Sequence, residues 1–193
     1  FLGQENLLGA MAVAKELGMS EEEISAAVKE IGDTFPGAKV RKGINGLTVI
    51  DATYSANPDG VMAGLEYLKT WPGPPAGEAG KKIIVMPCLI ELGKASKEVH
   101  KRIGEKIAQV CDLAIITTKD RFGDIKEAAS AEASASQRKV EVVYMENSEE
   151  IVEKIKGTTS AGLPAEALAK AGDVVLLEGR VPKELCKLLY VQS

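Results

Sequence analysis

The stretch that decides the fold reads Leu47-Thr48-Val49-Ile50-Asp51-Ala52-Thr53-Tyr54-Ser55-Ala56-Asn57-Pro58-Asp59. Its first half is apolar and β-branched, which predicts a short buried strand ending near Asp51. Its second half predicts the start of a helix, because Asn57 is a favoured N-cap, Pro58 suits the first helical position and Asp59 complements the helix dipole. A buried strand that leads through a polar loop into a helix is the building unit of a parallel α/β sheet.

The same alternation of strand and helix continues to the end of the chain. Strands are predicted at 83–86, 113–117, 140–144 and 173–177, and helices at 58–71, 96–110, 124–135, 148–156, 164–171 and 182–189. The strands are apolar without alternation, which fits a mostly parallel sheet with helices on both faces. Two short strands, 39–44 and 47–51, predict an antiparallel edge hairpin joined at Asn45-Gly46. Before them, 6–17 and 20–31 predict a pair of antiparallel helices.

Composition narrows the classes of partner. The net charge of −4 and the aromatic content of 4% argue against a nucleic-acid-binding surface. Apolar runs such as 174–177 are too short to span a membrane, so we expect a small-molecule partner and neither nucleic acid nor membrane. Three scattered cysteines, Cys88, Cys111 and Cys186, suggest reduced thiols and a cytoplasmic protein. The chain begins at Phe1 without an initiator Met, and we expect it to be part of a longer protein. Nothing in the composition predicts an oligomeric state.

Polar residues gather where the predicted strands end. In an open parallel sheet, ligands bind outside the carboxyl ends of the strands. The loops there are 51–54, 87–91, 117–120, 145–147 and 178–180, and they carry carboxylates, cations and amides. A polar small molecule is one explanation, and simple exposure of the loops is another. Likewise, the amides that follow Asn57 suit a nucleotide or carboxylate, or Asn57 is only a helix cap.

Several common catalytic and nucleotide-binding devices are missing. The Gly-x-Gly-x-x-Gly fingerprint follows none of the predicted strands, and 77–82 lacks two elements of a phosphate-binding loop and precedes a strand. His100 is the only histidine, which argues against a histidine-rich metal site or a histidine-dependent triad. Cys88 has no evident base nearby in the sequence and is more typical of a buried thiol than of a nucleophile. We therefore predict no metal ligands and no catalytic residues in this chain.

Four segments resemble the Mur ligase family in order and spacing. Residues 49–59 resemble the family's Val-Ile-Asp-Asp-Ser-Tyr-Asn-Ala-Asn-Pro-Asp segment, most closely that of the type that adds D-alanyl-D-alanine to a UDP-muramoyl peptide. Residues 90–93 with Ser96 and His100 resemble the Met-x-Glu-Leu-Gly…Ser…His stretch. Residues 3–9 resemble the Gly-x-His-Asn-x-x-Asn helix, and 177–180 are similar to the Lys-Gly-Ser-Arg segment.

The resemblance implies an organisation and an activity. Residues 1–35 would be the last helices of a central ATPase domain, and 36–193 would be a complete Rossmann-like C-terminal domain. The implied enzyme is an ATP-dependent ligase that activates a carboxylate as an acyl phosphate and joins it to an amine. ATP and Mg²⁺ are the implied cofactors, held mainly by an upstream domain, so these residues alone are expected to be inactive.

The resemblance also implies site residues. Those carried over to the adenosine side are Asn6, Asp51, Tyr54 and Asn57. Those carried over to the side of the incoming substrate are Glu91, Ser96, His100 and Arg180.

Departures from the family pattern leave the substrate open. Glu5 replaces the helix motif's His, Gly9 its second Asn, Ala38 an Arg, Ala52 the second Asp of the strand end, and Glu178 a Lys. A divergent ligase for another peptide polymer is one alternative. Others are an archaeal Mur-like ligase of pseudomurein assembly or of nickel-tetrapyrrole coenzyme synthesis, and a degenerate binding module without turnover.

Overall fold

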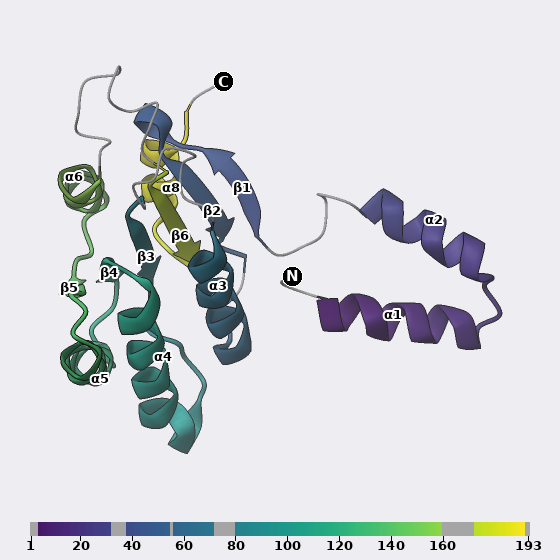
Figure 1. The fold of residues 1–193 in the computed structure, drawn as a ribbon, viewed down its shortest axis with the longest axis horizontal. Helices are drawn as coiled ribbons and strands as arrows, with labels where there is room; N and C mark the ends of the chain where they lie inside the picture. Colours follow the sequence, from purple (N-terminus) through teal and green to yellow (C-terminus); the bar gives the residue numbers. More distant parts are fainter. Residues whose placement is uncertain (1–3, 32–37, 55, 72–79, 160–171, 192–193) are drawn as a thin grey trace.

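A single six-stranded sheet forms the centre of the molecule. The computed structural model describes residues 4–31, 38–54, 56–71, 80–159 and 172–191. The strands are β1 (Lys39–Lys42), β2 (Thr48–Ala52), β3 (Lys82–Met86), β4 (Leu113–Ile116), β5 (Glu141–Tyr144) and β6 (Val174–Glu178), in the order β1-β2-β6-β3-β4-β5 (Figure 1). β1 pairs antiparallel with β2, and the other neighbouring strands are parallel. The predicted α/β class, with a mostly parallel sheet and an antiparallel edge hairpin, is confirmed.

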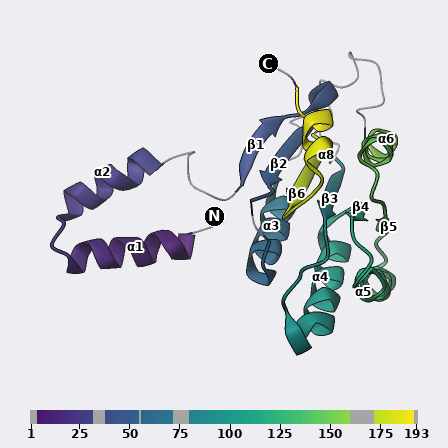
Figure 2. The ribbon, with the colours of Figure 1, turned by 180° about the vertical axis from the view of Figure 1, so that it is seen from behind.

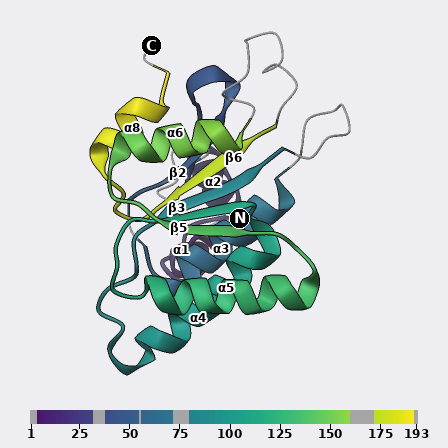
Figure 3. The ribbon, with the colours of Figure 1, turned by 90° about the vertical axis from the view of Figure 1, so that its left-hand side faces the viewer.

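Helices cover both faces of this sheet (Figure 3). One layer consists of α3 (Pro58–Thr70), α4 (Ser96–Val110) and α5 (Phe122–Ser136), and the other of α6 (Ser148–Thr158) and α8 (Lys183–Leu189). Successive residues of β3 face opposite layers, because strand side chains alternate: Ile84 packs with the first layer and Ile83 and Val85 with the second. Both faces are buried, which is why the strand sequences show no polar alternation.

The edge hairpin turns at the predicted Asn45-Gly46 pair. Asn45 and Gly46 both have positive φ, 50° and 79°, and the Leu47 amide donates to the Ile44 carbonyl at 3.0 Å. This is the arrangement of a two-residue turn whose twist matches that of the flanking strands. The first strand is shorter than predicted, because the chain leaves the ladder after Lys42 and forms a 3₁₀ turn at Ile44–Gly46.

The predicted helical pair is also present. It consists of α1 (Gln4–Glu16) and α2 (Glu21–Ile31), and it lies apart from the sheet (Figures 1 and 2). A capping box starts α2: the Glu23 amide donates to Ser20 Oγ at 3.2 Å, and the Ser20 amide donates to Glu23 Oε2 at 2.8 Å.

Two further expectations concern helices. The helix predicted at 164–171 lies outside the described residues. Within the described ranges, no helix has both the length and the apolar character that crossing a bilayer requires.

The packing of α4 on α5 depends on a glycine. A Cβ added at Gly104 would lie 2.4 Å from the backbone oxygen of Ile125 and 3.1 Å from the Cβ of Ala128. We expect Gly104→Ala to push the two helices apart and to lower the free energy of unfolding by about 1–3 kcal/mol, measured by urea denaturation.

Gly157 of α6 provides the matched control, because a Cβ there would meet nothing within 4 Å. Gly157→Ala should raise stability by up to about 1 kcal/mol, since alanine favours the helix. Equal effects of the two substitutions would show that close packing at Gly104 does not limit the approach of α4 to α5.

Candidate functional site

The carboxyl ends of five parallel strands meet at one edge of the sheet, which we call the carboxyl edge. Its centre is β6, whose last residue, Glu178, pairs in register with Ala52 of β2. The loops after β2 and β3 lead to α3 and α4 on one face, whereas the loop after β6 leads to α8 on the other. In α/β proteins, ligands commonly bind where neighbouring loops diverge in this way.

Asp51 lies at this edge and is held by neighbours. Its Oδ1 accepts from the Thr53 hydroxyl at 2.7 Å and from the Thr53 amide at 3.2 Å, and its Oδ2 accepts from Arg41 Nε at 3.0 Å. Burial acts to raise the pKa of Asp51, but the neighbouring polar groups of Thr53, Tyr190 and Arg41 outweigh it and leave the pKa below its usual value. Asp51 is thus an ionised group, and its hydrogen bonds hold the end of β2 to Thr53 and Arg41.

Tyr54 and Asn57 follow on the loop to α3. The Tyr54 side chain is 84% exposed, so its ring is open to a stacking partner. The Asn57 side chain accepts from the Gly60 amide at 2.8 Å and caps α3, which confirms the cap interpretation. A ligand role for Asn57 stays a prediction.

The loop between β3 and α4 presents Glu91. This residue is exposed and has a φ of +63°, a conformation that non-glycine residues rarely adopt. Ser96, at the start of α4, accepts on its Oγ from Arg121 Nε at 3.1 Å, and Arg121 pairs with Asp124 at 3.3 Å. His100 lies inside, with no exposed surface.

Arg180 completes the edge from the loop after β6. It is exposed and forms no ion pair with a described residue. The preceding Gly179 has a φ of +69°, and a Cβ there would lie 2.6 Å from the Cβ of Ala56, so β6 and the β2–α3 loop approach closely. Tyr54, Glu91 and Arg180 therefore lie on loops of the same edge.

Asn6 is not brought to this edge. It is exposed on α1, and α1 lies away from the sheet (Figure 2). Its predicted role stays a prediction.

Two residues at the edge are not among the site residues that the sequence predicted. Arg121 is one, and only the packing of its loop against Ser96 reveals it. Glu178 is the other: it is 2% exposed, its side chain bonds to none of the described residues, and its Oε2 lies 3.0 Å from where a Cβ would stand at Gly64. The available signal was an acid that ends the apolar run of 174–177.

The environment of Glu178 favours the protonated acid. Burial raises its pKa to about 8, because the charged form loses solvation and gains no partner among the described residues. Gly64, which lacks a side chain, makes room for the carboxyl group in the second turn of α3.

Metal ligands do not gather at this edge. The described residues contain no group of three or more His, Cys, Asp or Glu side chains placed to hold a metal ion. The described residues therefore do not fit a Mg²⁺ site. The three cysteines form no disulfide with one another.

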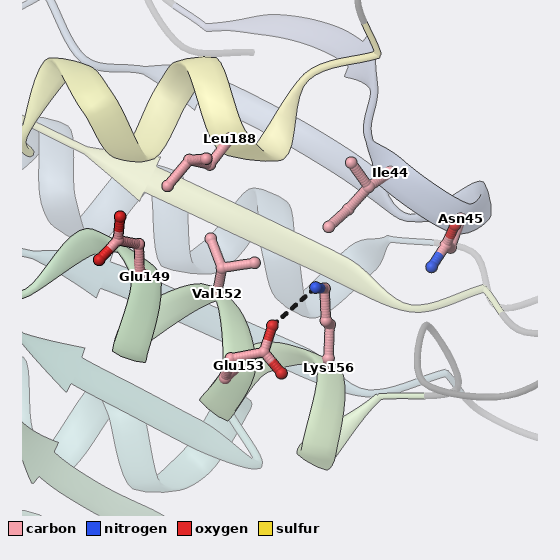
Figure 4. Close-up of a pocket in the computed structure, with 7 residues that line it drawn as sticks. All are labelled: Ile44, Asn45, Glu149, Val152, Glu153, Lys156 and Leu188. Atoms are coloured by element: carbon pink, nitrogen blue, oxygen red, sulfur yellow. Dashed lines mark hydrogen bonds and ion pairs between the residues drawn. The ribbon is translucent and has the colours of Figure 1, made fainter.

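A hollow of about 320 Å³ lies elsewhere, between the hairpin turn, α6 and α8 (Figure 4). Its cation, Lys156, is paired with Glu153 at 2.7 Å. It lies beside the turn that precedes β2, and none of the predicted site residues lines it.

The comparisons with known proteins agree with this architecture. Residues 38–181 match the family described as Mur ligase, glutamate ligase domain. The UDP-N-acetylmuramoyl-tripeptide–D-alanyl-D-alanine ligase of Mycobacterium leprae is 37% identical over an alignment of 108 residues that covers 51% of this chain and 21% of that protein. The enzyme of the same name from Bacillus subtilis is 26% identical over 110 residues, 55% of this chain and 23% of that one.

Solved structures show the same fold. The MurF ligase of Thermotoga maritima in complex with ADP has a TM-score of 0.63 at 23% identity, over 92% of this chain and 35% of that one. A MurF structure from Acinetobacter baumannii has a TM-score of 0.67 at 20% identity, over 91% of this chain and 34% of that one. This chain thus spans about a fifth of its sequence relatives and about a third of these structures.

The buried acid predicts a pH dependence of stability. The folded pKa of Glu178 is about 8, above the ordinary value of 4.5, so the unfolded chain releases this proton first. Its contribution to stability is full below pH 4.5 and is lost as the pH rises to about 8, by up to about 5 kcal/mol.

Glu178→Gln replaces the acid with an amide that does not ionise. The free energy of unfolding should therefore fall less between pH 5 and pH 8 in the variant than in the wild type, as measured by urea denaturation at both pH values. Glu146→Gln makes the same chemical change at an exposed strand end and should leave the profile unaltered. Parallel profiles for wild type and Glu178→Gln would contradict the assignment.

Proposed function

This chain belongs to the Mur ligase family, and from that premise we propose that it forms the C-terminal part of an ATP-dependent ligase. The proposed reaction has two steps. A carboxylate takes the terminal phosphoryl group of ATP to give an acyl phosphate and ADP, and an amine then attacks the carbonyl carbon and expels phosphate. The observation that supports this reaction is the family match over residues 38–181. The polar groups at the carboxyl edge are of the kind that a charged substrate requires.

The incoming substrate is the part of the reaction that this edge suits best. The sequence relatives are named for D-alanyl-D-alanine, and a dipeptide carries one carboxylate and one ammonium group. Exposed Arg180 suits the carboxylate, and exposed Glu91 suits the ammonium group. Ser96, held by Arg121, lies on the same side. A D-alanyl-D-alanine-like amine and a UDP-linked muramoyl peptide are therefore the substrates that we propose.

The adenosine of ATP is assigned to the loop after β2. The exposed ring of Tyr54 suits stacking on a base, and Asn57 and Asp51 lie beside it in the chain. We propose that Asn6, on α1 of the helical pair, contacts the same adenosine. The phosphates and Mg²⁺ are assigned to an upstream domain, because the described residues do not fit a metal site.

The domain division follows from the same premise. Residues 1–35 are proposed to end the central ATPase domain, and 36–193 to form the C-terminal domain. α1 exposes Leu8 and Val13, and Leu17 is exposed directly after the helix; these apolar side chains suit burial against further parts of a central domain. Action in the cytoplasm belongs to the same proposal, since ATP is the phosphoryl donor.

The second candidate is a binding module without turnover. It is favoured by Glu5, Gly9 and Ala52, which stand where the family pattern has other residues. The test is an assay of the full-length protein with magnesium-ATP, UDP-N-acetylmuramoyl-tripeptide and D-alanyl-D-alanine. Phosphate release that requires both substrates supports the ligase, whereas ATP or substrate binding without release supports the module.

Arg180→Ala should raise the KM for the incoming dipeptide about tenfold or more and leave the KM for ATP nearly unchanged, because one charge-assisted contact is lost. Initial-rate kinetics measure both. Lys187→Ala on α8 is the control, an exposed cation whose loss should alter neither constant. An unchanged dipeptide KM in Arg180→Ala would reject its role.

Leu8→Glu tests the domain division. In these 193 residues alone Leu8 is 57% exposed, so the substitution should change the melting temperature little. In the full-length protein it should lower the melting temperature, because a charge would replace an apolar contact between the helical pair and the rest of the central domain. Equal effects in both proteins would contradict the division.

A further inference from the structure

His100 is fully buried, and both of its ring nitrogens are engaged. Nε2 lies 2.9 Å from the Leu89 amide nitrogen, and Nδ1 lies 2.6 Å from the Ser96 carbonyl oxygen. An amide N–H only donates and a carbonyl oxygen only accepts, so Nε2 must be the acceptor and Nδ1 must carry the proton. The partners therefore select one neutral tautomer.

The imidazole connects α4 to the loop that carries Glu91. Leu89 stands two residues before Glu91, and its side chain is buried, so the loop is held at this point by both packing and the bond to His100. The preceding residue of the loop is also held, because the Cys88 amide donates to Thr118 Oγ1 at 2.8 Å. The next two residues, Ile90 and Glu91, are exposed.

The backbone of Glu91 requires such an anchor. Its φ of +63° is strained for a residue with a Cβ, and it persists only where the surroundings impose it. Without the acceptor at Nε2, the Leu89 amide would lose its hydrogen-bond partner in a buried position, which is unfavourable. The loop would then relax to bring that amide to solvent, and Glu91 would leave its place on the edge.

We propose that His100 does not contact the incoming substrate but is a positioning residue, whose neutral Nε2 anchors the 87–93 loop so that Glu91 meets the amine. The part that concerns the substrate rests on the proposed function. The part that concerns the loop rests on the two hydrogen bonds alone.

Two variants separate the hydrogen bond from the space that the ring fills. His100→Gln places an acceptor where Nε2 stands, and His100→Leu fills similar space without one. In ¹⁵N NMR of the 193-residue chain, we expect a neutral His100 with the proton on Nδ1, and an exchange-protected Leu89 amide. In His100→Leu, the exchange protection of the Leu89 amide should fall at least tenfold, while the amides of β3 keep their protection. In His100→Gln, most of the protection of the Leu89 amide should be retained.

In the full-length ligase, His100→Leu should raise the KM for the incoming amine about tenfold with little change in the KM for ATP, and His100→Gln should recover most of that loss. Three results would overturn the proposal: a proton on Nε2, unchanged Leu89 protection in His100→Leu, or a general loss of protection and melting temperature that His100→Gln does not reverse. A folded wild-type protein without ligase turnover would instead reject the proposed function, and with it the substrate part of this proposal, while the NMR result still decides the loop anchor.

Discussion

The structure depends on the insertion of β6 into the middle of the sheet. All five residues of β6 are buried, and its backbone pairs with β2 on one side and β3 on the other. Without it, the β1–β2 hairpin would have no ladder to join and the buried backbone groups of β2 and β3 would lack partners, which is costly. The same insertion makes the loops on either side diverge, so one set of backbone hydrogen bonds both completes the core and separates the loops at the carboxyl edge.

Hydrogen bonds hold the loops of the carboxyl edge in place. His100 holds Leu89, Thr118 holds Cys88, and Arg121 reaches across to Ser96. A loop whose backbone is already fixed by such bonds loses little backbone conformational entropy when a ligand binds. Glu178 has the opposite effect on stability. It is a buried acid without a partner among the described residues, and its burial lowers stability near neutral pH.

The sequence predicted the elements well, because their limits are set locally. Ser20 and Glu23 start α2, Asn57 starts α3, and the Asn45-Gly46 pair turns the hairpin, all through contacts within a few residues. It located the edge as well, since polar residues follow apolar strands. It did not predict that His100 points inward or that Arg121 joins the edge, because both depend on bonds between α4 and loops that precede or follow it.

By itself, the sequence determined the α/β class, the hairpin, the order of helices and strands, and the family, because periodicity, caps and motif spacing are local properties of the chain. Only the tertiary structure decided that β6 lies between β2 and β3, that Glu178 is buried beside Gly64, and that His100 supports the edge from within. The reason is physical: strand neighbours, burial and hydrogen-bond partners are set by packing between residues far apart in the chain, and no short stretch of sequence contains both members of such a contact.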